Sequence, residues 1–238
     1  MANLTITDND VGNVILADAK FRREILALAG ADTILEGTIL ARRKVSSTIA
    51  DGVAGGEDVG DGVCDACALY GNIIVPKIGA YVLECTAEVG NGGVWSLSDP
   101  SGVELLSGIT MTPGAGVTTI FNSAGLGFTF SLTDGSEDFD TGDTFTITIV
   151  ADGDLVPLDL TGEGGAQFPL SVLTYEVVVA AQADVAIRAM VSGSVRKEKL
   201  VIDGLAAGVS INDAIIDALR EVGIIAINVE ELNIEDND

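Results

Sequence analysis

Alternating apolar and polar positions dominate the middle of the chain and predict short antiparallel strands there. Residues Phe128–Leu132 and Thr144–Ile149 alternate strictly, so each strand has one apolar face and one face rich in Thr and Ser. Tyr81–Cys85 and Val94–Ser98 predict two further strands, and an Asp-Pro-Ser-Gly turn follows the second. One buried face and one wet face are typical of an antiparallel β-sandwich, with Trp95 as its expected core aromatic.

The sequence on either side of this region predicts a second β-rich unit. Phe21–Leu28 fits a helix or a strand by pattern alone. Thr38–Ala41 is expected as a short strand, and Val45–Thr48 as its continuation or as the next strand. Farther along, Leu170–Ala180 and Val185–Val191 are expected as two long apolar strands.

One helix is predicted near the C-terminus. Ser210 is a good N-cap residue, and Asp213 follows it at the spacing of a capping box. Apolar residues then share one helical face: Ile211, Ile215, Ala218, Leu219 and Val222. Gly223 fits the position just beyond the helix end, and Ile224–Val229 is expected as a last strand before an acidic tail.

Charge is distributed unevenly along the 238 residues. The chain has 36 acidic residues, 12 basic residues and no histidine, for a net charge of −24. Residues 57–154 hold 15 of the acids and a single base, Lys77. A domain inserted into a surface loop produces such a shift. We therefore expect a flexible arm at 1–19, a discontinuous scaffold at 20–56 and 155–238, and an inserted β-sandwich at 57–154. The fold class is mainly β, with one C-terminal helix.

Several classes of function are disfavoured. The negative charge opposes nucleic-acid phosphates, and no apolar run approaches the roughly 20 residues of a membrane span. Without histidine, the commonest acid–base group is missing, and no phosphate-binding Gly-rich loop is present. We expect no enzyme, no cofactor, no nucleic acid and no membrane partner. Met1–Thr5 lacks the start of a signal peptide, so we expect a cytoplasmic protein or one released by lysis.

The three cysteines offer weak candidate chemistry. Cys64 and Cys67 have CxxC spacing, but a closed zinc site needs four ligands and the chain has only Cys85 to add. The region is strand-and-turn sequence, whereas a thioredoxin-like motif opens a helix. Buried thiols are the favoured interpretation, and a disulfide from Cys64 or Cys67 to Cys85 is the alternative.

An acidic cluster is the best metal candidate. It comprises Asp134, Glu137, Asp138, Asp140 and Asp143. Calcium loops alternate oxygen ligands and end in a bidentate Glu, and this cluster lacks that register. A solvated β-turn is therefore favoured over a calcium site.

Two segments of the flanks carry a family resemblance. Phe21–Gly30 followed by Gly37–Arg42 resembles the opening of the lambda-type phage head decoration proteins. Pro169–Val177 is similar to a later strand of that family, and Val185–Val191 with the glycine after it is similar to the next. The resemblance covers roughly residues 20–205.

The middle of the chain is similar to a recurrent insert of phage head proteins. Its marks are Gly79-Ala80-Tyr81, the strand at Cys85, the Asp99–Gly102 turn, Phe128–Gly135, and Phe139 before Gly142–Phe145.

The resemblance implies a structural virion protein. Such proteins bind the outer surface of the expanded head as trimers, contact the major capsid protein and stabilise the shell. Their N-terminal arm adds to coat-protein β-structure, which makes Leu4, Thr5 and Ile6 candidate contacts here; a frayed tail is the equal alternative. The acidic insert is expected to project outward, with the more basic scaffold, Arg22, Arg23, Arg42, Arg43 and Lys44, nearer the shell. The competing hypothesis is a head fibre or adhesin-like sandwich that binds cell-surface sugars or proteins.

Overall fold

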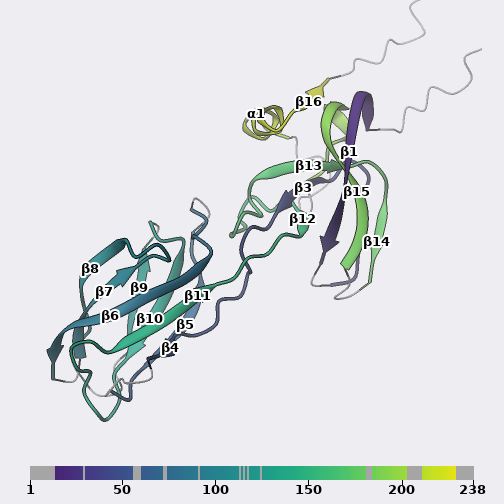
Figure 1. Ribbon diagram of the computed structural model, residues 1–238. Helices are drawn as coiled ribbons and strands as arrows, with labels where there is room; N and C mark the ends of the chain where they lie inside the picture. Colours follow the sequence, from purple (N-terminus) through teal and green to yellow (C-terminus); the bar gives the residue numbers. More distant parts are fainter. Residues whose placement is uncertain are drawn as a thin grey trace, which may run out of the picture. The chain divides into compact units, whose positions relative to one another are not determined.

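The computed structural model describes residues 14–28, 30–55, 60–71, 74–90, 92–112, 114, 116, 118–123, 125–180, 184–202 and 211–228. The chain divides into two compact units, which differ in colour range in Figure 1. Unit 1 comprises Met1–Arg42, Asp154–Leu160 and Ala166–Asp238, and unit 2 comprises Arg43–Gly153 and Thr161–Gly165.

Unit 1 is built on a ring of five strands. Around the ring the order is β1 (Ile15–Ala27), β12 (Leu155–Pro157), β3 (Ile39–Arg42), β13 (Pro169–Leu173) and β15 (Asp184–Arg196). A sixth strand, β16 (Ile224–Ile227), pairs with β15 outside the ring. Strand β1 also pairs with β15 in antiparallel register from Ile15↔Val195 to Ala27↔Asp184, so the pairing returns to its first strand. Closing the ring removes most of the exposed edge that an open sheet would present.

Two separate apolar clusters pack on the two faces of this ring. One takes residues from all five strands, among them Leu26, Leu40, Leu155, Leu173 and Ile187. Ile39 and Ala41, on either side of Leu40, and Val172, next to Leu173, point the opposite way and join the second cluster, because side chains alternate across a strand. The second cluster is completed by the helix α1 (Asp213–Glu221).

Among the described residues, α1 is the one α-helix, as the sequence predicted near the C-terminus. Its N-cap is Asn212, whose side chain accepts a hydrogen bond from the Ile215 backbone N–H at 2.9 Å. Ser210, the predicted cap, lies outside the described residues, and the helix begins three residues after it. Ile215, Ile216 and Leu219 form the buried face. No helix of the described residues is long and apolar enough to span a membrane.

The expected long strand Leu170–Ala180 is wrong. It is divided into β13 and β14 (Val177–Val179), and β14 pairs only with β2 (Asp32–Ile34) in a separate two-stranded sheet. Val45–Thr48 is also not a strand. Val45 makes an isolated bridge to Ala151, and the residues after it, up to Thr48, are irregular.

Unit 2 contains two antiparallel sheets. One runs β5 (Val63–Leu69), β10 (Phe128–Thr133), β9 (Thr118–Ser123). The other runs β4 (Val53–Ala54), β11 (Thr144–Ile149), β6 (Gly79–Val89), β7 (Gly92–Ser98), β8 (Glu104–Thr110). Inward side chains of both sheets share one apolar cluster, to which the predicted Phe128, Phe130 and Ile147 belong.

Trp95 is the centre of that cluster, as predicted. It is fully buried, its ring centroid lies 4.9 Å from that of Phe139 in an edge-to-face contact, and Phe145 follows at 5.7 Å. Its indole N–H donates to Met111 Sδ at 3.1 Å. Such aromatic pairs add about 0.5–1.5 kcal/mol each beyond their buried area.

Two boundaries differ from the predicted ones. Strand β1 begins at Ile15, so the last residues of the expected arm, 15–19, are strand in this structure. The first segment of unit 1 ends at Arg42, where β3 pairs with Leu155, whereas composition put the break near residue 57.

Candidate functional site

The predicted arm contacts Leu4, Thr5 and Ile6 lie outside the described residues, but the point from which the arm leaves is well fixed. Val14 is fully buried, and its backbone N–H donates to the Glu36 carboxylate at 2.7 Å. The Val14 carbonyl accepts from the Arg196 backbone N–H at 2.9 Å. Any segment that precedes Val14 therefore starts from a firm position beside β15.

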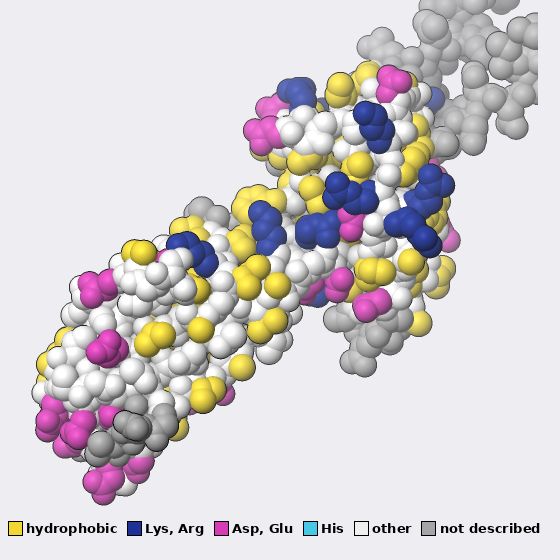
Figure 2. Space-filling model, in the orientation of Figure 1, with side chains coloured by type: hydrophobic (Ala, Val, Ile, Leu, Met, Phe, Trp, Pro, Cys, Tyr) yellow, Lys and Arg dark blue, Asp and Glu magenta, His cyan; other side chains and the backbone are white. Residues whose placement is uncertain are grey.

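Basic side chains gather on unit 1. Figure 2 shows Lys and Arg over the unit that carries β1, β3 and β15, and Asp and Glu concentrated at one end of the other unit. The Glu24 carboxylate, mostly buried, lies 2.6 Å from the Arg42 guanidinium and 3.6 Å from that of Arg22. Arg43, also expected in this basic group, belongs to unit 2 and pairs there with Asp152 at 2.5 Å.

An exposed surface on β1 and β15 combines aromatic, aliphatic and arginine side chains. The Arg188 guanidinium carbon lies 5.1 Å from the ring centroid of Phe21, within cation–π range. The Arg188 backbone N–H donates to the Tyr175 hydroxyl at 3.0 Å. Phe21, Ile25 and Tyr175 are each about 40 % exposed. We call this set, Phe21, Ile25, Tyr175 and Arg188, the aromatic–arginine patch. Tyr and Arg, two of its four residue types, are enriched in binding hot spots.

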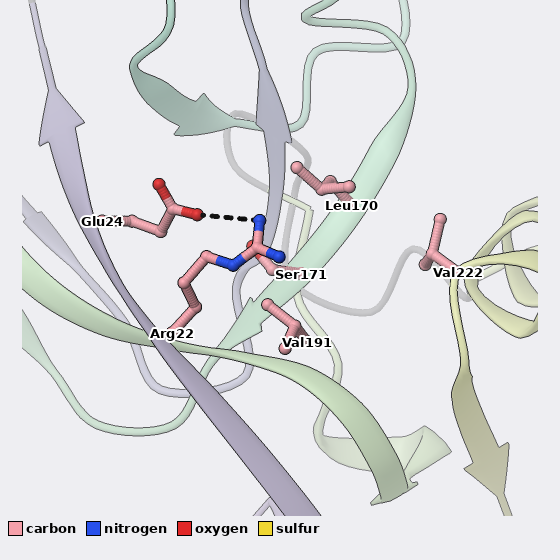
Figure 3. Close-up of a pocket in the computed structure, with 6 residues that line it drawn as sticks. All are labelled: Arg22, Glu24, Leu170, Ser171, Val191 and Val222. Atoms are coloured by element: carbon pink, nitrogen blue, oxygen red, sulfur yellow. Dashed lines mark ion pairs between the residues drawn. The ribbon is translucent and has the colours of Figure 1, made fainter.

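A small pocket opens on unit 1, lined in part by Arg22 and Glu24 of β1. It measures about 200 Å³ and is lined by Arg22, Glu24, Leu170, Ser171, Val191 and Val222. Figure 3 shows the Arg22–Glu24 pair over Ser171 and Val191, with Val222 on the opposite side. The Ser171 hydroxyl is buried and has no hydrogen-bond partner among the described residues. Ligand pockets usually enclose about 300–1,000 Å³, so this one suits a single side chain better than a cofactor.

Comparison with protein-family models gives a match over most of the chain. The model of the bacteriophage lambda head decoration protein D family matches residues 4–224, from the arm to the strand after the helix. The chain belongs to this family. No curated protein and no solved structure matches it.

Family membership supports a role in decorating the phage capsid and a location in the virion head, because the family is one of structural head proteins. The matched range includes Leu4, Thr5 and Ile6 as well as β1, β3, β13 and β15. It agrees with the resemblance drawn from the flanking segments. The family is structural, which agrees with the expectation that the protein is not an enzyme.

The acidic cluster of this decoration protein is a set of turn contacts. Asp143 accepts hydrogen bonds from the backbone N–H groups of Gly60 and Asp140 at 3.0 and 2.9 Å. Asp61, absent from the predicted cluster, accepts from the Glu137 N–H and the Ser136 hydroxyl. Among the residues the structure describes, no three His, Cys, Asp or Glu side chains are placed to hold a metal ion.

Asp134 is the unusual member of the cluster. Its side chain is buried, and neither carboxylate oxygen has a hydrogen-bond partner in the described part of the chain. Burial, with the nearby charge of Asp138, raises the pKa of this carboxyl. Asp138 and Asp140, by contrast, lie exposed.

The lone base of the acidic region is already engaged. The Lys77 ammonium pairs with Asp99, which also accepts hydrogen bonds from the backbone N–H groups of Ser101 and Val103. The Lys77 contact is the main reason that the pKa of Asp99 lies below its usual range. This arrangement closes the predicted Asp-Pro-Ser-Gly turn.

The cysteines are free and buried, as the favoured interpretation had it. The Cys85 thiol hydrogen-bonds the Ala87 carbonyl at 3.5 Å and makes no disulfide to Cys64 or Cys67. The adhesin hypothesis needed exposed aromatics on the middle region, and Trp95 is not available for it because it is fully buried.

Proposed function

We propose that this decoration protein binds the outer surface of the expanded head as a homotrimer, contacts the major capsid protein and stabilises the shell against internal pressure. The match to the head decoration family over residues 4–224 is the observation that carries the proposal. The expected long strand Leu170–Ala180 no longer supports the trimer, because β13 has a pairing partner on each side. The trimer therefore rests on the family alone.

The N-terminal arm is proposed as one contact with the coat protein. The fixed position of Val14 supports this role, since a segment tethered at a buried residue loses less freedom on binding than one on a mobile stem. Leu4 and Ile6 alternate with polar neighbours, which suits an added strand. Many weak contacts repeated over a shell add up through multivalency.

The aromatic–arginine patch is proposed as a second contact. Arg188 can be tested against Arg220, which is also exposed on unit 1 but pairs with Asp217 at 2.5 Å, outside the patch. Arg188→Ala is expected to weaken binding to expanded capsids about 5- to 30-fold, or by about 1–2 kcal/mol. Arg220→Ala is expected to bind as the unchanged protein does. Equal binding by both variants would remove the patch from the proposal.

Unit 2 is proposed as an inserted domain that projects away from the shell. Its acid excess and its self-contained apolar cluster support this. Arg22, Arg23, Arg42 and Arg188 lie on unit 1 and favour that unit as the side nearer the coat.

Electron microscopy of capsids with and without the protein tests the whole proposal. We expect three copies around each three-fold or quasi-three-fold position on the outer surface, with unit 2 outermost. Heating the two kinds of capsid and measuring DNA release tests stabilisation: decorated capsids should retain DNA to higher temperature. Equal release from both would contradict stabilisation, and density on the inner surface or for isolated single copies would contradict the proposed binding mode.

A further inference from the structure

Cys64 and Cys67 lie on the same face of β5, which a regular strand does not allow. Residues three apart on a strand point to opposite faces and lie about 10 Å apart along it. Here Cys64 is 2 % exposed and Cys67 is 9 % exposed, and both belong to the apolar cluster of unit 2. Asp65 and Ala68, in contrast, are not buried.

A β-bulge explains the shared face. Asp65 pairs with Ser131 and Ala68 with Thr129, so two residues of β5, Ala66 and Cys67, stand opposite a single residue of β10. Ala66 has the left-handed φ of 49°, one of two such values for non-glycine residues in the described chain.

The bulge turns both cysteine side chains to the same side of the strand. Cys67 Sγ lies 3.8 Å from the carbonyl oxygen of Asp65, so its side chain turns back toward the start of the strand. A disulfide requires Cα atoms within about 7 Å and side chains that converge. The bulge gives the two cysteines a shared face that a regular strand lacks.

We propose that Cys64 and Cys67 form an intrachain disulfide when the protein meets a small-molecule disulfide oxidant, such as oxidised glutathione, outside a reducing compartment. The Cys67 thiolate attacks one oxidant sulfur, a mixed disulfide forms, and one thiol leaves. Cys64 then loses its proton and attacks the Cys67 sulfur, which releases the second thiol. The protein gives up two protons and two electrons, and the oxidant becomes two thiols.

The environment assigns the order of attack. The hydrogen bond from Cys64 lowers the pKa of Cys67, against the effect of burial. The same contact, followed by burial, raises the pKa of Cys64. Cys67 is also the more exposed of the two. Cys85 does not compete, because burial raises the pKa of its thiol and it lies on β6, in the other sheet of unit 2.

The test uses the full chain, folded, in buffers of reduced and of oxidised glutathione. Free thiols are blocked with an alkylating reagent under acid quench, and the linked peptides are mapped by mass spectrometry. In the oxidised buffer we expect the loss of two of the three thiols, with Cys64 linked to Cys67 and Cys85 alkylated. Cys85→Ser is the matched control and should still lose two thiols. Cys64→Ser should retain Cys67 as a free thiol or a glutathione adduct.

Mapping of the unchanged protein needs no variant, so the result does not depend on whether a variant folds. Three free thiols in a buffer that oxidises a model CxxC peptide would overturn the proposal. A link through Cys85, or a link between two chains, would overturn it equally.

Discussion

Removing the arm tests how the N-terminal segment is attached, and the structure fixes where the cut must fall. Deleting residues 2–12 leaves Asn13 before Val14, so Val14 keeps the peptide N–H that donates to Glu36. Nothing buried among the described residues is lost, and the free energy of unfolding should change by less than about 0.5 kcal/mol. Binding to expanded capsids should weaken, because the proposed coat contacts at Leu4 and Ile6 are gone.

Deleting residues 2–19 is the contrasting cut. It removes the fully buried Val14 side chain, worth about 1.5–3 kcal/mol, and its hydrogen bond to the Glu36 carboxylate, worth about 1.5–3 kcal/mol. It also removes the start of β1, including the pairing of Ile15 with Val195. Unit 1 should therefore lose about 3–6 kcal/mol.

Urea unfolding followed by circular dichroism measures both deletions, and co-sedimentation with capsids measures binding. A large loss of stability on deleting residues 2–12 would show that the arm belongs to the folded core. Full stability after deleting residues 2–19 would refute the anchoring role of Val14. Unchanged capsid binding by the folded 2–12 deletion would refute the arm as a coat contact.

Three further predictions follow from packing, charge and unit boundaries. Gly193→Ala should destabilise unit 1 by about 2–3 kcal/mol, since it strains a positive φ and puts Cβ 2.8 Å from the backbone carbonyl oxygen of Asp18. Gly223→Ala is also strained, but its nearest atom lies at 3.6 Å, so it should cost about 1 kcal/mol in the same denaturation assay. The pKa of Asp134 is raised in the folded protein, so the folded state binds this proton more tightly, and the free energy of unfolding falls as pH rises from the unfolded pKa through the folded one. The pKa of Asp99 is lowered in the folded protein, so the contribution of Asp99 to the free energy of unfolding is lost as pH falls through the folded pKa. Asp134→Asn should therefore flatten the slope of melting temperature against pH above about pH 4, and Asp99→Asn should flatten it below about pH 4. Slopes unchanged in both variants would refute these assignments. Replacing residues 43–153 by a short Gly-Ser linker should leave unit 1 folded by its near-native circular dichroism, and its failure to fold would show that the units share one core.

Strict alternation was the most reliable signal in this sequence. Phe128, Phe130 and Leu132 are fully buried as the pattern required, and Phe145 and Ile147 face the same cluster. Alternation works there because each strand has one buried and one wet face. The sequence pattern missed β8, because its exposed edge carries no clear alternation. It also missed β5, where the bulge at Ala66 interrupts the period of two.

The break within Leu170–Ala180 could not be found by local pattern. Val172 and Val177 are both buried, but they serve different clusters on opposite faces of the ring. Apolar sequence predicts that a residue is buried, but it does not predict which sheet the residue joins. The pairing partners come from distant parts of the chain. Tyr175 lies between β13 and β14, where the chain passes from the larger sheet to the two-stranded one. Its hydroxyl accepts a hydrogen bond from the Arg188 backbone N–H.

The boundary between the two compact units does not coincide with the change in charge composition near residue 57. Arg42 and Arg43 are neighbours with the same charge, yet Arg42 pairs with Glu24 in unit 1 and Arg43 with Asp152 in unit 2. Composition averages over many residues, whereas membership of a unit depends on the contacts that each residue makes. Counting Arg43 and Lys44 with the scaffold overstated its basic character. The proposed orientation toward the shell therefore depends on Arg22, Arg23, Arg42 and Arg188, and a capsid reconstruction should find coat-protein density nearest these four.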